Sequence, residues 1–381
     1  MTTIYLIRHA EAEGNLYRVY QGQYDTLLTE TGKLQVQALG ERFRDIHVDA
    51  VYSSDLYRAA CTAAVICRMK GLPLNQVPAL REIDVGSRQA KAMGDVRRAE
   101  AQEGRQGLSE QEKCRIRGGE TSEQVRVRTL AALQTIAAAH EGETVVVVSH
   151  GAAIRYVVTH LLGAERDSLV TGQNTGVSVL EWENGALRVV DYNDASHLDV
   201  WMEKLLGRPY HQRDTGLQPG LWYRNPETEE CGKWLRAAFQ LPEGAACPSY
   251  DAADVLLGIR EEEPAGILAL LPEKDAEQGI GWIDALWVKP ELRCRSCGIQ
   301  LLGQAVFRYR ALGRGILRTA VPETDGTTLE FLRHHGFVPV EEQTGDGRCI
   351  LEKDIAFHPL GGITITRRVH YHQGISETSA L

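Results

Sequence analysis

The chain of 381 residues lacks the features that would place it among membrane or nucleic-acid-binding proteins. No apolar run approaches the ~20 residues of a membrane-spanning helix, so we expect no membrane partner. An excess of basic residues is also missing: 42 Lys and Arg stand against 51 Asp and Glu, for a formal net charge of −9. A general nucleic-acid binder is usually basic, so we expect no nucleic-acid partner. An anionic substrate would need a local cationic pocket.

Signs of export and of a metal site are missing as well. The first residues run straight into a strand that bears the charged Arg8, which leaves no room for the apolar core of a signal peptide. The eight cysteines are scattered, as expected for free thiols in a reducing, cytoplasmic location. His370 and His372 have no evident third ligand, and the pair Cys294 and Cys297 has no second pair, so we expect no metal.

Strand and helix patterns alternate through the first half of the chain, which indicates an α/β domain with a mostly parallel sheet covered on both faces. We expect strands at 4–7, 49–53, 74–77 and 145–148, helices at 32–43 (capped from Thr29), 55–69, 122–139 and 151–162, and a hairpin of 177–182 with 187–190. A charged segment between 77 and 122 reads as irregular. The pattern breaks at a cluster of Gly and Pro between 202 and 220, which indicates a domain boundary.

The second half indicates a separate α+β domain. We expect helices at 229–239, 298–312 and 328–335, and strands at 255–259, 266–271, 283–288, 315–321 and 349–355, with an edge strand in 363–371. We therefore predict a first domain over 1–205, a linker over 206–220, a second domain over 221–356 and a C-terminal tail over 357–381.

Polar residues gather where the strands of the first domain end. Arg8 and His9 follow one apolar run, His150 follows another, and Arg58 lies in the first turn of a helix after a third. Catalytic groups in open α/β sheets cluster at the carboxyl ends of parallel strands, and helix starts present N–H groups that suit a phosphate. This set of histidines and arginines suits phosphoryl transfer, in which catalysis is mainly positioning and charge neutralisation.

Several motifs in the same order resemble the histidine phosphatase (phosphoglycerate mutase-like) superfamily over roughly residues 1–200. The segment from Arg8 to Asn15 is similar to its R-H-G-x-x-x-x-N signature, with Ala10 in place of glycine. Further matches are Gln21-Gly22, Leu28-Thr29-Glu30-Thr31-Gly32, Ser53-Ser54-Asp55-Leu56-Tyr57-Arg58-Ala59, Leu80-Arg81-Glu82 and Val148-Ser149-His150-Gly151. The resemblance implies a three-layer α/β/α, phosphoglycerate mutase-like domain.

The resemblance also implies a role for each matched residue. His9 would be the nucleophile that forms a phosphohistidine, and Glu82 would protonate the leaving oxygen and then deprotonate water. Arg8, Arg58, His150 and Asn15 would hold the phosphoryl oxygens, with Gln21 and Gly22 also binding the substrate. No metal takes part. The implied activity is hydrolysis of a small phosphomonoester.

The substrate stays open because the segment after Glu82 departs from the family. The family often continues with G-x-W-E-G, whereas Gly86 is followed here by Ser87-Arg88-Gln89-Ala90. Residues 88–119, which would form a cap over the substrate, are therefore atypical. A mutase normally has a longer insert, so the short domain favours a phosphatase, with a phosphoglycerate mutase-type phosphotransferase as the alternative.

A second anion-binding pattern lies at 283–312, where a strand, a loop with small residues and a helix follow one another. Its loop resembles the acyl-CoA motif R/Q-x-x-G-x-G/A of the GNAT acetyltransferase superfamily, with Ser296 in place of the first glycine. Residues 331–337 are similar to a later F-Y-x-x-x-G-F motif of the same GNAT (acyl-CoA N-acyltransferase) fold, and the resemblance covers roughly 217–355. The implied cofactor-binding residues are Val288, Arg293, Cys294, Arg295, Ser296, Cys297, Gly298 and Ile299.

The resemblance implies acetyl-CoA as cofactor and an amine, of unknown identity, as acceptor. Asp284 is placed where a general base could deprotonate that amine through water. Leu332 occupies the position of a tyrosine that GNAT enzymes commonly use as general acid. We therefore keep two alternatives for the chain: a bifunctional phosphatase and N-acetyltransferase, or a phosphatase that a non-catalytic acyl-CoA-binding GNAT domain regulates or tethers.

Overall fold

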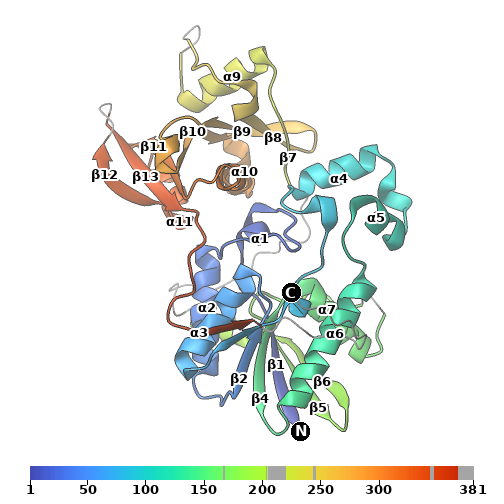
Figure 1. Ribbon diagram of the computed structural model, residues 1–381. Helices are drawn as coiled ribbons and strands as arrows, with labels where there is room; N and C mark the ends of the chain where they lie inside the picture. The colour runs from blue at the N-terminus through green and yellow to red at the C-terminus, as the bar shows by residue number, and fades with distance from the viewer. Residues whose placement is uncertain (166–167, 203, 205–219, 243–245, 344–346, 368–381) are drawn as a thin grey trace, which may run out of the picture.

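Two sheets of seven strands each organise the residues that the structure describes, and they lie one above the other in Figure 1. The structure is a computed structural model of the chain. It describes every residue except 166–167, 203, 205–219, 243–245, 344–346 and 368–381.

The first sheet is mostly parallel, as predicted. Its strand order is β14-β3-β2-β4-β1-β5-β6. The pairings from β14 to β1 are parallel, and β5 and β6 continue the sheet as an antiparallel hairpin. The strands are β1 (Thr2–Arg8), β2 (Ala50–Ser53), β3 (Leu74–Gln76), β4 (Thr144–Ser149), β5 (Val177–Glu183), β6 (Ala186–Asp194) and β14 (Ile365–Arg367).

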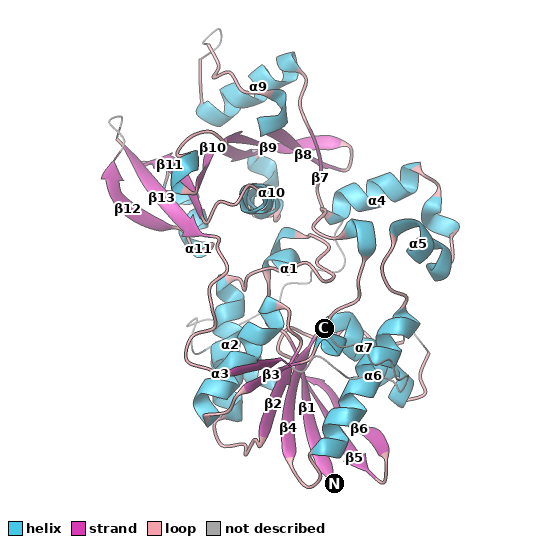
Figure 2. Ribbon diagram, viewed as in Figure 1, coloured by secondary structure: helices cyan, strands magenta, loops and turns pink. Residues whose placement is uncertain are grey.

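Helices cover both faces of this sheet, which confirms a three-layer α/β/α arrangement (Figure 2). One face packs against α2 (Glu30–Phe43) and α3 (Tyr57–Lys70), through apolar residues such as Leu39 and Ile66. The other face packs against α6 (Ser122–Ala139) and α7 (Gly151–Leu161). The predicted cap of α2 is confirmed, because the Thr29 hydroxyl accepts a hydrogen bond from the amide of Gly32.

The segment that we expected to be irregular contains two helices, and this expectation was wrong. They are α4 (Met93–Gln102) and α5 (Glu110–Arg117). Few of their residues are buried, so they give no apolar periodicity. A capping box between Ser109 and Glu112 starts α5 instead. A short helix, α1 (Glu13–Tyr17), was also not predicted.

The second sheet is mixed, with α10 and α11 packed on one face and α9 on the other. Its order is β12-β13-β11-β10-β9-β8-β7, and only β10 and β11 pair in parallel. The strands are β7 (Trp222–Arg224), β8 (Val255–Arg260), β9 (Glu263–Leu271), β10 (Ile280–Val288), β11 (Ile316–Pro322), β12 (Val338–Gln343) and β13 (Arg348–Asp354). The helices are α9 (Thr228–Phe239), α10 (Cys297–Ala311) and α11 (Gly326–His334). The α+β class is confirmed.

Single turns of other helix types connect these elements. Turns of 3-10 helix lie at Pro78–Leu80, Gly86–Arg88, Arg105–Gly107, Ala252–Asp254, Ala276–Gln278 and Pro290–Leu292, and a π turn lies at Leu198–Met202. Within the described ranges, no helix is long and apolar enough to cross a membrane. Those ranges also contain no group of three or more His, Cys, Asp or Glu that could hold a metal ion.

After the second sheet, the chain returns to the first. Leu360 and Ile363 pack on its α2–α3 side, and β14 pairs in parallel with β3 as an edge strand. An edge strand was predicted over 363–371; its last four positions, which include His370, and the neighbouring His372 lie outside the described residues. Almost all of the predicted linker lies outside them too, so the domain limits stay a prediction.

Candidate active site

His9 lies at the carboxyl end of β1, at the edge of the sheet where the neighbouring strand β4 also ends. Arg8 is in register with Ser149, and the amide of His9 donates to the carbonyl of Ser149 at 3.0 Å. His150 therefore follows directly beside His9, and the two ring centroids lie 5.1 Å apart. The parallel pairing brings together residues that are far apart in sequence.

The His9 ring is buried and held in one orientation. Its Nδ1 lies 2.7 Å from the carbonyl oxygen of Ala10, a group that can only accept a hydrogen bond, so Nδ1 is the protonated nitrogen. Nε2 is then left with its lone pair. Burial, followed by the charges of Arg58 and Arg8, holds the pKa of His9 well below its usual value. The imidazole is therefore neutral near pH 7, as a nucleophile requires.

Arg58 is fully buried in the first turn of α3, and backbone carbonyls orient it. Its Nη1 donates to the carbonyl of Tyr24 at 3.0 Å and its Nη2 to that of Gly22 at 2.7 Å. Burial lowers its pKa to about 10, so the guanidinium remains charged near pH 7. The segment between α1 and α2 thus determines where this charge lies.

Several buried polar atoms around His9 have no hydrogen-bond partner within the described part of the chain. They are both ring nitrogens of His150 and the Nε atoms of Arg8 and Arg58. Buried polar groups are normally satisfied, so these atoms are candidates to bind a ligand. Burial and the charge of Arg58 also hold the pKa of His150 well below its usual value.

Glu82 lies beside His150, at the start of α7. Its carboxylate accepts from the amides of Ala152 and Ala153, both at 3.2 Å, and from that of Ile83 at 2.9 Å. His150 is the N-cap of the same helix. We expected the start of α7 to face a phosphate, but two of its amides bind the carboxylate of Glu82, the candidate acid. This contact places Glu82 at the same strand ends as His9.

The three candidate substrate-binding residues lie on and after α1, and the side-chain hydrogen bonds given for Asn15 and Gln21 stay within that region. The Asn15 side chain accepts from the amide of Ala12, and that of Gln21 accepts from the hydroxyl of Thr26. Gly22 supplies the carbonyl that binds Arg58. It has a positive φ of 51°, and a Cβ there would lie 2.8 Å from a methyl carbon of Val85. Glycine is needed at this position for both reasons.

The second predicted loop lies between β10 and α10 and has an unusual backbone. Cys294 and Ser296 have φ values of 59° and 60°, in the left-handed region that favours glycine. Ser296, which replaces a motif glycine, is the N-cap of the 15-residue helix α10. Alternation of left-handed and right-handed residues turns successive N–H groups toward one side, which makes an anion-binding concavity.

The other residues of this loop lie around the start of α10. Val288 ends β10, and its carbonyl accepts from Nε of Arg293 at 3.3 Å. Cys297 and Ile299 are buried in the core of the second sheet, Cys294 is exposed, and Arg295 precedes the N-cap. A Cβ on Gly298 would contact the ring of Phe331 at 3.5 Å. The two left-handed residues at the start of α10 are compatible with the pyrophosphate of the acyl-CoA that the motif implies.

Asp284 lies at a bulge in β10. The antiparallel register with β9 shifts between Ile283 and Ala285, and the parallel pairing with β11 ends at Ile283. The Tyr250 hydroxyl donates to the Asp284 carboxylate. Burial and this carboxylate raise the pKa of Tyr250 strongly. Leu332 is buried in the core of the second sheet, so the tyrosine that the motif would place there has no counterpart at that position.

The comparison with known families now decides the identity of the first half. The model of the histidine phosphatase superfamily (branch 1) matches residues 4–195, half of the chain. The chain belongs to this superfamily. The model of the acetyltransferase (GNAT) family matches residues 222–337, so one chain contains a histidine phosphatase domain and a GNAT domain.

Similar proteins match the histidine phosphatase domain. "Probable phosphoglycerate mutase GpmB" of Salmonella choleraesuis (strain SC-B67) is 32% identical over 207 residues, 52% of this chain and 96% of that relative. Among solved structures, "Bacillus stearothermophilus YhfR" is 30% identical, with a TM-score of 0.49, and covers 52% of this chain and 100% of its own. Phosphoserine phosphatase of Entamoeba histolytica is 27% identical, with a TM-score of 0.43, and covers 52% and 100%.

Sequence reasoning missed several residues that support the histidine phosphatase site. Arg128 on α6 donates to the carbonyls of Ala79, Arg81 and Glu82, and thereby fixes the turn that presents Glu82. Asn174 donates to the carbonyl of His9 at 2.9 Å. The contacts join residues that lie far apart along the chain, so no spacing pattern could have identified them.

Proposed function

We propose that the histidine phosphatase domain hydrolyses a small phosphomonoester through a phosphohistidine on His9, without a metal. The observation that carries this proposal is a buried His9 whose Nδ1 proton is engaged by a carbonyl, so that a neutral Nε2 stands among cationic side chains. The unpartnered nitrogens of Arg8, Arg58 and His150 support binding of the phosphoryl oxygens. Residues on and after α1, among them Asn15, Gln21 and Gly22, would complete the substrate site.

The reaction proceeds in two displacements at phosphorus. Nε2 of His9 forms a bond to phosphorus while the bond to the ester oxygen breaks, and Glu82 gives that oxygen a proton. Water then attacks phosphorus, Glu82 accepts a proton from it, and the P–N bond breaks to release inorganic phosphate. Arg58 and Arg8 neutralise the charge that develops on the phosphoryl oxygens in both steps.

The test is a panel of phosphorylated small metabolites assayed with the full chain, with His9→Ala and with His47→Ala as a matched control. His47 is exposed and precedes β2, at the opposite end of the sheet from His9. We expect wild type and His47→Ala to release phosphate and His9→Ala to release essentially none. Full activity in His9→Ala would refute the phosphohistidine route.

A mutase reaction is the second candidate, because relatives 32% identical have the name "Probable phosphoglycerate mutase GpmB". The same enzyme preparation separates the two activities. Transfer between the two hydroxyl positions of a phosphoglycerate would exceed phosphate release by a large factor if the mutase candidate is correct. We expect the opposite ratio.

For the GNAT domain we propose acetyl-CoA binding at residues 288 and 293–299, and acetyl transfer to an amine with Asp284 as the base. Acetyl-CoA supplies the activated acyl group. The two left-handed residues before α10 support binding of its pyrophosphate, and the Asp284 bulge beside Tyr250 supports a site for the amine. Eight free cysteines support a reducing, cytoplasmic compartment for both activities.

A change at Ser296 tests the loop, with CoA as the probe in a calorimetric titration. A residue with a side chain pays about 1 kcal/mol for the left-handed conformation, and Ser296→Gly removes this cost. CoA should therefore bind to this variant as tightly as to wild type or more tightly. Ser296→Val places a β-branched residue in that conformation and should weaken binding. Equal affinity in all three proteins would argue against a site at this loop.

Buried Leu332 favours the other candidate, a GNAT domain that binds acyl-CoA without transferring the acyl group. An acetyl-transfer assay with a panel of amines separates the two. Transfer that Asp284→Asn abolishes supports the enzyme. Tight CoA binding with no transfer to any amine supports a sensor that regulates or tethers the phosphatase.

A further inference from the structure

The segment that positions Arg58 is itself held by the GNAT domain. Helix α1 and the following residues, up to Leu28, supply the Gly22 and Tyr24 carbonyls that bind the Arg58 guanidinium. Helix α10 packs directly on α1, and the two lie side by side in Figure 1. Arg58 is therefore linked to a helix of the other domain through this segment, which binds Arg58 by its carbonyls and packs against α10.

A buried ion pair is the first of two side-chain contacts between α10 and this segment. Arg310 on α10 donates from Nη1 and Nη2 to the Glu13 carboxylate, at 2.8 and 3.0 Å, and the two side chains are only 9% and 3% exposed. Glu13 also accepts from the amide of Leu27 at 3.0 Å. One carboxylate therefore ties the start of α1 to the end of the segment, and Arg310 fixes that carboxylate.

The second contact between α10 and this segment is aromatic. The Phe307 ring lies 5.6 Å from that of Tyr24 and 6.1 Å from that of Tyr17, measured between centroids. The backbone carbonyl of Tyr24 is one of the two that orient Arg58. A Cβ on Gly303 would lie only 2.5 Å from Tyr17, which shows how closely α10 approaches α1.

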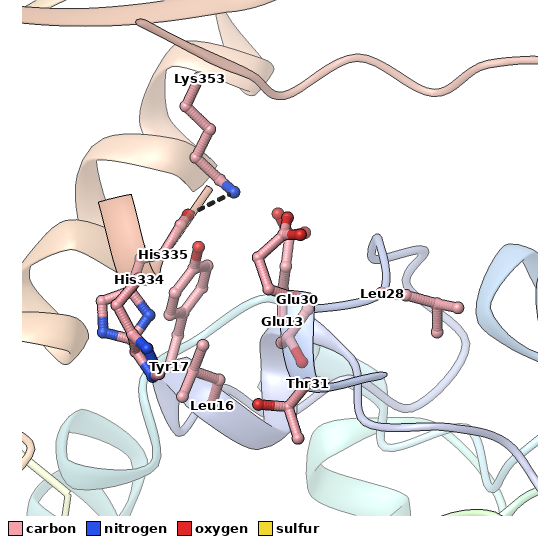
Figure 3. A pocket seen from close by; sticks show the side chains of 10 residues that line it. Glu13, Leu16, Tyr17, Leu28, Glu30, Thr31, His334, His335 and Lys353 are labelled. Atoms are coloured by element: carbon pink, nitrogen blue, oxygen red, sulfur yellow. Dashed lines mark hydrogen bonds between the residues drawn. The ribbon is translucent and has the colours of Figure 1, made fainter. Parts of the chain in front are cut away.

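A small hollow lies beside the ion pair, and its walls come from both domains. Figure 3 shows Glu13, Tyr17 and Glu30 of the phosphatase domain facing Lys353, His334 and His335 of the second half. Lys353 donates to the carbonyl of His335, and burial lowers its pKa. Glu13 and Arg310 beside this hollow are almost fully buried, so a lost partner of either is not readily replaced by water.

We propose that Phe307 and Arg310 are positioning residues of the phosphatase site: they hold residues 13–28 in place and, through the carbonyls of that segment, the Arg58 guanidinium. This inference rests on the proposed phosphatase function. It means that the site of the histidine phosphatase domain is completed by a helix of the GNAT domain.

The test compares variants of the full chain. Glu13→Gln with Arg310→Met removes both charges together, so that no lone charge stays buried, and Phe307→Leu removes the aromatic contact independently. Arg308→Met is the matched control, because Arg308 lies on the same helix but pairs with Asp254 of its own domain. The readouts are kcat and KM for a phosphomonoester, Kd for inorganic phosphate, and Tm.

We expect kcat to fall about 10- to 100-fold in both altered proteins, and Kd for phosphate to rise about tenfold or more. The reason is that a small displacement of the Arg58 guanidinium from the phosphoryl oxygens lowers the rate steeply. Arg308→Met should keep wild-type values. A merely structural role would lower Tm and leave kcat per folded molecule and Kd unchanged. That result in both altered proteins would overturn the proposal.

Phosphate binding separates this proposal from the proposed function. If wild type binds phosphate but hydrolyses no ester, the phosphatase proposal fails, and the positioning role is then decided by Kd alone. If the variants hydrolyse and bind as wild type does, the positioning role fails and the phosphatase stands. Failure of wild type to bind phosphate at millimolar concentration would overturn both.

Discussion

The reactivity of His9 is decided by one proton and its position on the ring. A carbonyl acceptor at Nδ1 is more selective than a water molecule, because a carbonyl cannot donate and so excludes the other tautomer. Neighbouring arginines oppose a second proton. The same charges that would bind a phosphate therefore also keep the His9 ring neutral.

Glu82 gives a prediction at the scale of the residue. Glu82→Gln keeps the size of the side chain and one acceptor for the amides at the start of α7, but it cannot transfer a proton. We expect kcat for an alkyl phosphate to fall roughly 10²- to 10⁴-fold. For p-nitrophenyl phosphate the loss should be much smaller in the first step, because that leaving group needs little protonation. Equal losses with both substrates in single-turnover measurements would contradict the acid role.

At the scale of the element, α6 holds the turn that presents Glu82. Arg128→Met removes hydrogen bonds to three carbonyls and to Glu120, and we expect about 2 kcal/mol or more of lost stability together with a lower kcat. Denaturant unfolding and steady-state kinetics measure the two effects. Arg126→Met, on the same helix, breaks only a pair with the exposed Glu123 and should change stability by no more than about 0.5 kcal/mol. Equal effects of the two variants would refute the role of Arg128.

The sequence predicted most elements because their apolar faces repeat with a clear period. Helix α6 was placed at its observed bounds, since residues such as Val125, Ala132 and Ile136 recur on one buried face. Helices α4 and α5 bury few residues and so escaped this reasoning, although the Ser109–Glu112 capping box was visible in the sequence. Strand β7 has three residues, too few to show a period.

The sequence did not predict strand β12, and it predicted part of the site. Pro339 argues against a central strand, and β12 is indeed an edge strand, which we did not predict. Motif order predicted that Arg8, His9, Arg58, Glu82 and His150 belong to one site, and the strand ends do bring His9 and His150 together. No local pattern could predict Arg310, because its partner Glu13 belongs to another domain and only tertiary packing joins them.

At the scale of the whole molecule, buried histidines make stability depend on pH. Burial and the charge of Arg42 lower the pKa of His197 to about 4, and His9 and His150 are shifted in the same direction. The unfolded chain takes up these protons near pH 6.5, whereas the folded chain does not. The contribution of His197 to stability is therefore full well above pH 6.5 and is lost as pH falls toward 4, at up to about 1.4 kcal/mol per pH unit. His9 and His150 act in the same direction.

The slope of stability against pH measures this effect. Between pH 6.5 and 5, the free energy of unfolding of His197→Gln should fall less steeply than that of wild type by about 1 kcal/mol per pH unit. The comparison of slopes is independent of any constant loss from the hydrogen bond between His197 and Thr175. Parallel slopes in the two proteins would show that His197 takes up its proton in the folded state.

The pairing of β14 with β3 has a consequence for how the chain is made. Synthesis at about 5–20 residues per second needs roughly ten seconds or more to produce the second sheet after β6 has emerged from the ribosome. During that time the edge of β3 has no neighbour on its outer side, because β14 is translated only after β13. An uncovered strand edge can pair with another nascent chain. Strand β14, the last that the structure describes, therefore covers the β3 edge of the first sheet, and this edge stays open to other nascent chains until β14 has been made.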